Sequence, residues 1–315
     1  MKDELDSKIV ITGGSGFIGS YMVKCLKRHG YTNITIVDIV PPRSDGDIFV
    51  KADFDDNRIM GGVLNGARYV FHFAAMVGVD KCRLHPEDVY GINDINTKKF
   101  IDHCASKGVK RFIFSSSSEI YGNSKDIPYR EDGNSEPFSD YAKCKIEIEK
   151  YLKNVQSTCK MTVGIVRFFN IYGCGQKKDF VASIFVDKAL KNLPLTILGD
   201  GLQTRCFTFV DDAVEGVYGV FKYSGSSYEI FNIGNSAEYS INQLAEMVLK
   251  IVPQSKSEIV HQNYGNEIRN GNLEIFRRVP AVEKAYAMLA FKATTTLEQG
   301  LRSMVDYLTL NEKPQ

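Results

Sequence analysis

The sequence predicts an α/β fold: a doubly wound parallel sheet with helices on both faces, followed by a smaller C-terminal lobe. Three observations predict it. Short apolar runs alternate with helical patterns through the first half of the 315 residues, a glycine-rich turn joins the first run to the first helix, and an aspartate ends the second run. Strands that alternate with helices form parallel sheets, because each helix returns the chain to the same edge.

The first elements have the clearest signals. Residues 8–12 form a β-branched run, and residues 17–29 have helical spacing and stop at Gly30, which favours a helix C-terminus. Residues 33–37 form a second apolar run that ends in Asp38. Further strands are predicted at 69–74, 111–115 and 162–167, and helices at 88–107, which Gly108 ends, and at 141–155.

The second half is less regular. Helices are predicted at 181–191, 212–223 and 242–251, and loops rich in glycine or containing proline at 173–176, 193–201 and 265–271. We expect the lobe formed by the later segments to close over the carboxyl ends of the strands, where such sheets bind ligands.

Composition excludes several classes of partner. Lys plus Arg is 39 and Asp plus Glu is 38, so the net charge of +1 gives no reason to expect nucleic acid or a membrane surface. The acidic N-terminus is not a secretory signal, and no apolar run approaches the roughly 20 residues of a membrane span. The seven cysteines are scattered without a C-x-x-C pattern, which predicts reduced thiols, no metal and a cytoplasmic location.

Gly13, Gly16 and Gly19 form the pattern G-x-x-G-x-x-G between the first strand and the first helix. Glycines there permit a tight turn and let backbone amides and the helix N-terminus approach a pyrophosphate. Asp38 follows Gly19 by 19 residues, where a carboxylate accepts hydrogen bonds from ribose hydroxyls and repels a 2′-phosphate. The sequence therefore predicts a Rossmann dinucleotide site that favours NAD, although Arg43 lies nearby.

The predicted domains follow from this site. Residues 1–172, with a return segment at about 206–235, form the NAD-binding Rossmann domain, and residues 173–205 and 236–315 form the substrate-binding lobe.

Tyr141 and Lys145 lie four residues apart, which places them on one face of the predicted helix. Free tyrosine has a pKa near ~10, and a neighbouring ammonium favours the phenolate. Such a tyrosine accepts a hydroxyl proton while hydride leaves the same carbon.

Several motifs occur together along nearly the whole chain. They are TGGSGFIGS at 12–20, Asp53 in KADF, FHFAA at 71–75, Asn93, GVKRFIFSSSSEIYG at 108–122, YAKCK at 141–145, RFFNIYG at 167–173 and GDGLQTRCFTFVDD at 199–212. With these motifs the chain resembles the extended short-chain dehydrogenase/reductase family, in particular its nucleotide-sugar epimerases, dehydratases and decarboxylases.

The resemblance implies roles for further residues. Ser117 would hold the reacting sugar oxygen, and Lys145 would also bind the nicotinamide ribose. Asp53 and Phe54 would contact the adenine. The other implied cofactor contacts are Gly13, Gly16, Phe17, Ile18, Gly19, Asp38, Phe73, Ala74, Ala75, Asn93, Ser115, Tyr141 and Lys145. The implied substrate contacts are Val77, Ser117, Ser118, Asn170, Arg205 and Arg278, the two arginines at the diphosphate because their planar forks pair with phosphate oxygens. Arg277, next to Arg278, competes for that role.

The chain departs from the family pattern at three places near the substrate. Cys82 replaces a frequent serine, VASIF lacks the usual proline after the RFFNIYG loop, and Ala281 replaces an acid after RRVP. These departures leave the sugar and the nucleobase open.

The reaction is expected to begin with oxidation at C4 of a nucleotide-diphosphate sugar. The enzyme is then expected to act as a 4-epimerase or a 4,6-dehydratase. A decarboxylase or a plain 4-dehydrogenase is an alternative. Glu119 occupies the position of a glutamate in dehydratases and decarboxylases, where it would remove the C5 proton, but a polar strand-end residue fits equally well.

Two alternatives come from other classes. A non-catalytic NAD(H)-sensing regulator would keep the fold, but such proteins usually lose the Tyr–Lys pair or the serine. An enzyme for a steroid or flavonoid alcohol would not need Arg205. The resemblance also implies a homodimer or a dimer of dimers, pairing through the helices at 88–107 and 141–155.

Overall fold

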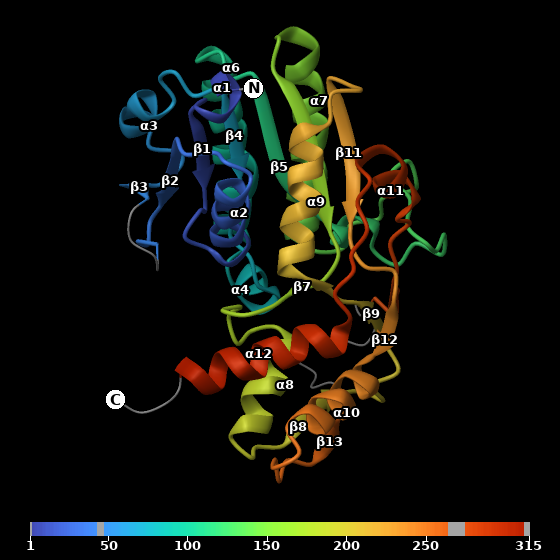
Figure 1. The fold of residues 1–315 in the computed structure, drawn as a ribbon. Coiled ribbons are helices and arrows are strands. Elements are labelled where there is room, and N and C mark those ends of the chain that lie inside the picture. The colour runs from blue at the N-terminus through green and yellow to red at the C-terminus, as the bar shows by residue number, and fades with distance from the viewer. Residues whose placement is uncertain (1, 43–46, 264–274, 312–315) are drawn as a thin grey trace.

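A computed structural model describes residues 2–42, 47–263 and 275–311 and shows a seven-stranded parallel sheet (Figure 1). The strand order is β11-β6-β5-β4-β1-β2-β3. The strands are β1 Ile9–Thr12, β2 Ile34–Asp38, β3 Ile48–Lys51, β4 Tyr69–His72, β5 Arg111–Ser117, β6 Thr162–Phe168 and β11 Tyr228–Ile233. The predicted doubly wound parallel sheet is confirmed.

Helices bury both faces of the sheet. On one face lie α2 (Phe17–Arg28) and α9 (Val210–Lys222), whose apolar residues form one core with alternate residues of β1. On the other lie α3 (Asn57–Val63), α6 (Thr97–Ser106) and α7 (Asp140–Thr158), which pack in a second core. Burial on both faces explains why the strands read as continuous apolar runs.

A third core lies in the C-terminal lobe. It is formed mainly by α8 (Val181–Leu190), α10 (Ile241–Ile251) and α12 (Leu297–Asn311), with β8 (Leu195–Leu198) paired to β13 (Ile259–Gln262). The lobe lies at the carboxyl ends of the sheet strands, because β7 (Ile171–Tyr172) follows β6 directly and leads into α8 (Figure 1).

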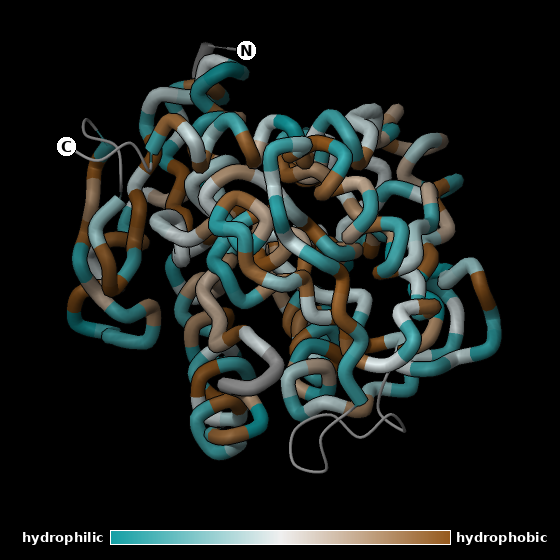
Figure 2. The backbone as a smooth tube through the Cα atoms, turned by 90° about the horizontal axis from the view of Figure 1, so that it is seen from below, coloured by the Kyte–Doolittle hydropathy of each residue, from teal (hydrophilic) through white to brown (hydrophobic). Residues whose placement is uncertain are grey.

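Short elements complete the described chain. They are α1 Lys2–Leu5, α4 Val79–Leu84, α5 Pro86–Tyr90, the π-helix η1 Gly91–Asn96, the 3₁₀-helix η2 Ser118–Tyr121, β9 Thr204–Cys206, β10 Thr208–Phe209, β12 Glu238–Ser240, β14 Arg277–Arg278 and α11 Glu283–Leu289. Figure 2 shows hydrophilic residues on many of the outer turns and hydrophobic stretches running through the interior. In the described part of the chain, no helix combines the length and the apolarity that a membrane crossing requires.

Three predicted segments differ from the structure. The helix predicted at 88–107 consists of α5, η1 and α6, because a π-turn interrupts the α-helical hydrogen bonds. The loop predicted at 193–201 contains β8, which pairs with β13. The strand predicted at 69–74 ends at His72, and the loop predicted at 265–271 lies outside the described residues.

Candidate active site

The glycine-rich turn packs too closely for side chains at two of the three glycines of the G-x-x-G-x-x-G pattern. A Cβ at Gly13, which has φ +70°, would lie 2.5 Å from the Ala74 amide nitrogen. A Cβ at Gly19 would lie 2.2 Å from the Gly13 carbonyl oxygen. At Gly16 the sole close neighbour of a Cβ is that same oxygen, at 3.0 Å. Because Gly13 and Gly19 have no side chain, the turn can pack against the chain after β4 and the first helix can pack against the turn. The backbone at Gly16, where α2 begins, is less crowded.

The open side of this turn suits an anion. Gly16 is the N-cap of α2 and gives no side-chain cap, so the first amides of the helix are available to a ligand. The Ser15 hydroxyl is buried without a hydrogen-bond partner in the described structure. Phe17 and Ile18 begin the helix at this point. These features fit the pyrophosphate of a dinucleotide.

Asp38, at the end of β2, is held against the same turn. Its carboxylate accepts hydrogen bonds from the Ser15 amide (3.1 Å) and the Val40 amide (3.2 Å), one on each oxygen. Each oxygen keeps a further lone pair, so the carboxylate is oriented and can still accept hydrogen bonds from a ribose.

Backbone contacts fix the floor of the predicted cofactor site. The amides of Phe73 and Ala74 both donate to the Thr12 carbonyl, at 3.0 and 3.1 Å, so the chain after β4, including Ala75, runs alongside the end of β1. Phe54 is buried with its ring 4.8 Å from the His72 ring.

Three predicted cofactor residues are engaged with the chain itself or shielded by it. Asn93 accepts from the Met76 amide (2.8 Å) and donates to the Met76 carbonyl (2.9 Å), so its side chain holds that segment in place. The Ser115 hydroxyl donates to the His72 carbonyl (3.0 Å). Burial, followed by the charge of Asp55, raises the pKa of Asp53. The amide of Asn93 and the hydroxyl of Ser115 thus support the wall of the site.

Ser117, Tyr141 and Lys145 come together at the carboxyl end of β5. Ser117 ends β5, and the other two lie in the first two turns of α7. Ser117 shares a hydrogen bond with the Tyr141 phenol. Lys145 donates from Nζ to the Ser115 carbonyl (2.7 Å), and this nitrogen lies 5.5 Å from the centre of the Tyr141 ring. The predicted constellation is therefore assembled.

The expectation that Lys145 lowers the pKa of Tyr141 is wrong for this structure. Burial, then the charge of Glu119, raises the pKa of the phenol, and the hydrogen bond with Ser117 opposes them. Burial also lowers the pKa of Lys145 to about 8. The lysine bonds to a carbonyl, so its charge does not act on the phenol as the spacing suggested. Ionising Tyr141 at neutral pH needs further positive charge in the bound complex.

Glu119 lies in η2 and is partly buried. Its Oε2 accepts a hydrogen bond from the Ser139 hydroxyl (3.0 Å), and its amide donates to Ser117 Oγ (3.2 Å). Sequence reasoning missed Ser139, which caps α7 two residues before Tyr141. Its position ahead of a helix was the available signal.

The predicted diphosphate arginines are neighbours. Arg205 in β9 pairs in register with Arg278 in β14, and Arg205 Nη1 donates to the carbonyls of Thr204 and Ile275, both at 2.7 Å. Arg277 makes two bonds of 2.8 Å to Glu238. Arg278 Nε is buried with no hydrogen-bond partner in the described structure, so Arg278 is better placed than Arg277 to receive an anion.

The remaining substrate candidates differ in exposure. Asn170 has φ +39° and a buried Oδ1 without a hydrogen-bond partner in the described residues. Val77 is 47 % exposed and Ser118 is 1 % exposed. Of the family departures, Cys82 is buried near Tyr141 and raises the pKa of the phenol less than burial and Glu119 do, and Ala281 is buried.

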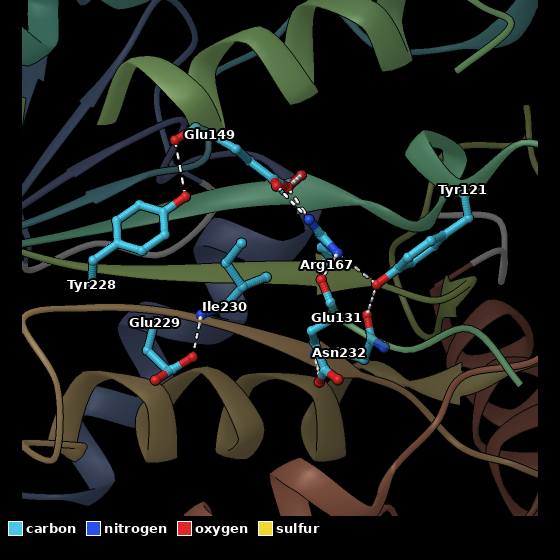
Figure 3. A network of polar contacts seen from close by, with 9 residues as sticks. Tyr121, Glu131, Glu149, Arg167, Tyr228, Glu229, Ile230 and Asn232 are labelled. Atoms are coloured by element: carbon cyan, nitrogen blue, oxygen red, sulfur yellow. Dashed lines mark hydrogen bonds and ion pairs between the residues drawn. The ribbon is translucent and has the colours of Figure 1, made fainter. Parts of the chain in front are cut away.

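A buried ion pair that sequence reasoning missed ties α7 to the sheet (Figure 3). Glu149 of α7 accepts from Arg167 of β6, with Nη2–Oε2 at 2.7 Å and Nε–Oε1 at 3.1 Å. The Ser116 hydroxyl donates to the same carboxylate, and Arg167 Nη1 donates to the Tyr121 hydroxyl (2.8 Å). The helix that carries the Tyr–Lys pair is thereby fixed against β5 and β6.

Comparison with known proteins shows which family this chain resembles. A model of the NAD dependent epimerase/dehydratase family matches residues 9–234. The chain is 34 % identical to the UDP-N-acetyl-alpha-D-glucosaminuronate decarboxylase of Bacillus cytotoxicus, over 96 % of this chain and 98 % of that protein.

Two solved structures are also similar. MoeE5 in complex with UDP-glucuronic acid and NAD has a TM-score of 0.88 at 26 % identity, covering 96 % of this chain and 99 % of that one. The UDP-glucose 4-epimerase of Thermotoga maritima, solved with UDP-glucose, has a TM-score of 0.89 at 27 % identity, with the same coverage.

Proposed function

The chain belongs to the NAD dependent epimerase/dehydratase family, and from this membership we propose a reaction in two parts: oxidation at C4 of a nucleotide-diphosphate sugar, then proton transfer at C5. The observation that carries the second part is the position of Glu119: its amide donates to Ser117 Oγ (3.2 Å), and its carboxylate accepts from Ser139 (3.0 Å), two residues before Tyr141. A 4-epimerase needs Ser117, Tyr141 and Lys145 alone. A carboxylate near the phenol favours a decarboxylase, the activity that the relative from Bacillus cytotoxicus is named for, and after it a 4,6-dehydratase.

The enzyme depends on NAD, in keeping with its family. We assign the pyrophosphate to the turn at Gly13, Gly16 and Gly19 and the adenine ribose to Asp38, which accepts hydrogen bonds and disfavours a 2′-phosphate. When bound, NAD supplies the acceptor for the hydride that leaves C4 and one positive charge.

We assign the first proton transfer to Tyr141. Ser117 holds the sugar O4, and the phenolate oxygen of Tyr141 takes the O4 proton as the C4 hydrogen leaves as hydride. Lys145 is held by the Ser115 carbonyl and contributes a buried positive charge when protonated. This step turns the C4 alcohol into a ketone.

The C4 ketone activates C5. In a uronic acid the C5–C6 bond then breaks, CO₂ leaves, and the electron pair of that bond passes through C5 to the C4 carbonyl oxygen to give an enolate. Glu119 in its protonated form delivers a proton to C5, and the ketone re-forms. In a substrate with a C6 hydroxyl, the ionised Glu119 instead removes the C5 proton, and the C6 hydroxyl leaves as water with the proton that Glu119 then gives up.

The nucleotide end of the substrate is assigned to the lobe of residues 173–205 and 236–315. Arg205 and Arg278 lie side by side in register, and the unpartnered Nε of Arg278 is a buried donor that suits the diphosphate. Asn170 Oδ1 is a buried acceptor at the same end of the sheet. Together they support a nucleotide-linked rather than an apolar substrate.

We also propose a cytoplasmic homodimer, or a dimer of dimers. All seven cysteines are free, which suits a reducing compartment. The helices expected to pair carry exposed apolar side chains, with Ile95 51 % exposed and Tyr90 39 % exposed. Covering these residues by a second copy would remove apolar surface from water.

The test is product identification in D₂O. Purified protein is incubated with UDP-glucuronic acid, UDP-N-acetylglucosaminuronic acid, UDP-glucose and dTDP-glucose, and products are identified by mass and NMR. A decarboxylase removes CO₂ from a uronic acid and places deuterium at C5, whereas a dehydratase removes water from a neutral sugar with exchange at C5. Inversion at C4 without deuterium at C5 would leave C4 oxidation standing and contradict the role of Glu119.

A further inference from the structure

We propose that Ser139 is a positioning residue for the C5 proton transfer, because its hydroxyl orients the Glu119 carboxylate while it caps the helix that carries Tyr141. The inference rests on the proposed function and names a residue that the family motifs above do not include. It follows from four hydrogen bonds and from the order of residues along α7.

The direction of the Ser139 hydroxyl is fixed by its two contacts. Its Oγ accepts a hydrogen bond from the Ala142 amide at 3.1 Å, the usual N-cap contact. An amide has no lone pair to accept a proton, so the hydroxyl hydrogen of Ser139 is free for the other neighbour, Glu119 Oε2, at 3.0 Å. One hydroxyl therefore serves the helix as acceptor and the carboxylate as donor.

Glu119 is held at both of its ends by serines. Its amide donates to Ser117 Oγ (3.2 Å), and its carboxylate accepts from Ser139 Oγ (3.0 Å). Ser117 in turn bonds to the phenol of Tyr141. The group proposed for C5 and the group proposed for C4 are thus connected through Ser117 and through the start of α7.

The Ser139 contact also selects one oxygen of the carboxylate. Within the described part of the chain Oε2 is the oxygen that accepts a hydrogen bond, which leaves Oε1 to exchange a proton with C5. A hydroxyl donor orients the Glu119 carboxylate without placing the charge of an ammonium or guanidinium beside it.

Three substitutions separate this role from simple capping. Ser139→Thr keeps both the acceptor and the donor. Ser139→Asp keeps the cap acceptor but removes the donor to Glu119 and adds a like charge beside it. Ser139→Ala removes both contacts, and because the loss of a cap can destabilise the helix, Ser139→Asp is the deciding variant.

The experiment follows the two steps separately after mixing each enzyme with UDP-glucuronic acid, or with whichever sugar the product panel identifies, in D₂O. Absorbance of the reduced nicotinamide reports C4 oxidation, and NMR reports deuterium at C5. We expect Thr to match the wild type within about threefold in both steps. Ala should slow deuterium entry by about tenfold or more while C4 oxidation stays within about threefold. Asp adds a negative charge near Tyr141 and slows both steps, but it should slow deuterium entry by about tenfold more than it slows C4 oxidation.

Combining Ser139→Ala with Glu119→Gln completes the test. If Ser139 acts through Glu119, the double variant loses no more C5 exchange than Glu119→Gln alone. Additive losses, or an equal slowing of C4 oxidation and C5 exchange by Asp, would overturn the inference and leave Ser139 as a cap. A wild type that oxidises C4 but places no deuterium at C5 would overturn the role of Glu119 and this inference together.

Discussion

Lys145 is a buried cation, and its burial has a measurable effect on stability. The folded chain holds its pKa at about 8, against an unfolded value near ~10.4. Between these values the unfolded chain binds the proton and the folded chain does not. Rising pH through this window therefore favours the folded state, by about 3 kcal/mol in total for a shift of this size.

Lys145→Met should remove this dependence. The free energy of unfolding of the variant, relative to the wild type, is expected to fall by about 3 kcal/mol between pH 8 and pH 10.4, because the wild type alone gains stability there. Urea unfolding of both proteins at several pH values measures it. A difference that stays constant with pH would show that Lys145 titrates normally.

Asp38 should set the choice of cofactor. Asp38→Ala removes the carboxylate that is oriented by the Ser15 and Val40 amides, so NAD should bind about tenfold or more weakly and NADP should gain relative to it. Calorimetric titration of both cofactors tests this. Wild-type protein that binds NADP as tightly as NAD would show that the ribose assignment is wrong.

The four serines at 115–118 show that residue type alone does not predict the role of a side chain in a site. Their hydroxyls point to different partners: Ser115 to the His72 carbonyl, Ser116 to Glu149 and Ser117 to Tyr141, while Ser118 is buried in η2. The family resemblance distinguished Ser117. The partners of the others depend on contacts 33 or more residues away, which local patterns do not contain.

The turn between β1 and α2 gives a matched pair of glycine substitutions. Gly19→Ala places a Cβ 2.2 Å from the Gly13 carbonyl, so the turn must shift and NAD affinity should fall at least about tenfold. A Cβ at Gly61 of α3 meets nothing within 4 Å, so Gly61→Ala should leave NAD binding unchanged and stabilise the fold by about 0.5–1 kcal/mol. Cofactor titration and urea unfolding of both variants check this, and equal NAD affinities would contradict the packing argument.

Elements with a strong periodic signal were predicted within a few residues. β1, α2 and β2 were found because two-sided burial and a glycine cap leave local traces. The π-turn η1 was missed, since hydrogen bonds to the fifth residue leave no apolar period of their own. β8 was missed because it is a strand only through its pairing with β13, more than 60 residues later.

The Arg167–Glu149 pair connects α7, the helix that carries Tyr141 and Lys145, to the sheet. Both side chains are nearly fully buried. Arg167→Met leaves the Glu149 carboxylate buried without its main partner, which should cost about 3–5 kcal/mol of unfolding free energy. Lys150→Met, which removes the exposed partner of Glu147, should change it by no more than about 1 kcal/mol. Urea unfolding distinguishes them, and similar losses would contradict a special role for the buried pair.

The molecule as a whole brings Ser117, Tyr141 and Lys145 together at the carboxyl end of β5. The most direct test of this account is the rate at which reduced nicotinamide forms when the NAD-loaded enzyme is mixed with the nucleotide sugars. The wild type should form it with at least one of them. Tyr141→Phe keeps the ring but loses the proton acceptor, so it should be slower by about 10²- to 10⁴-fold. A loss under about tenfold, or no reduced nicotinamide from any sugar with the wild type, would contradict the assignment of Tyr141 as the catalytic base.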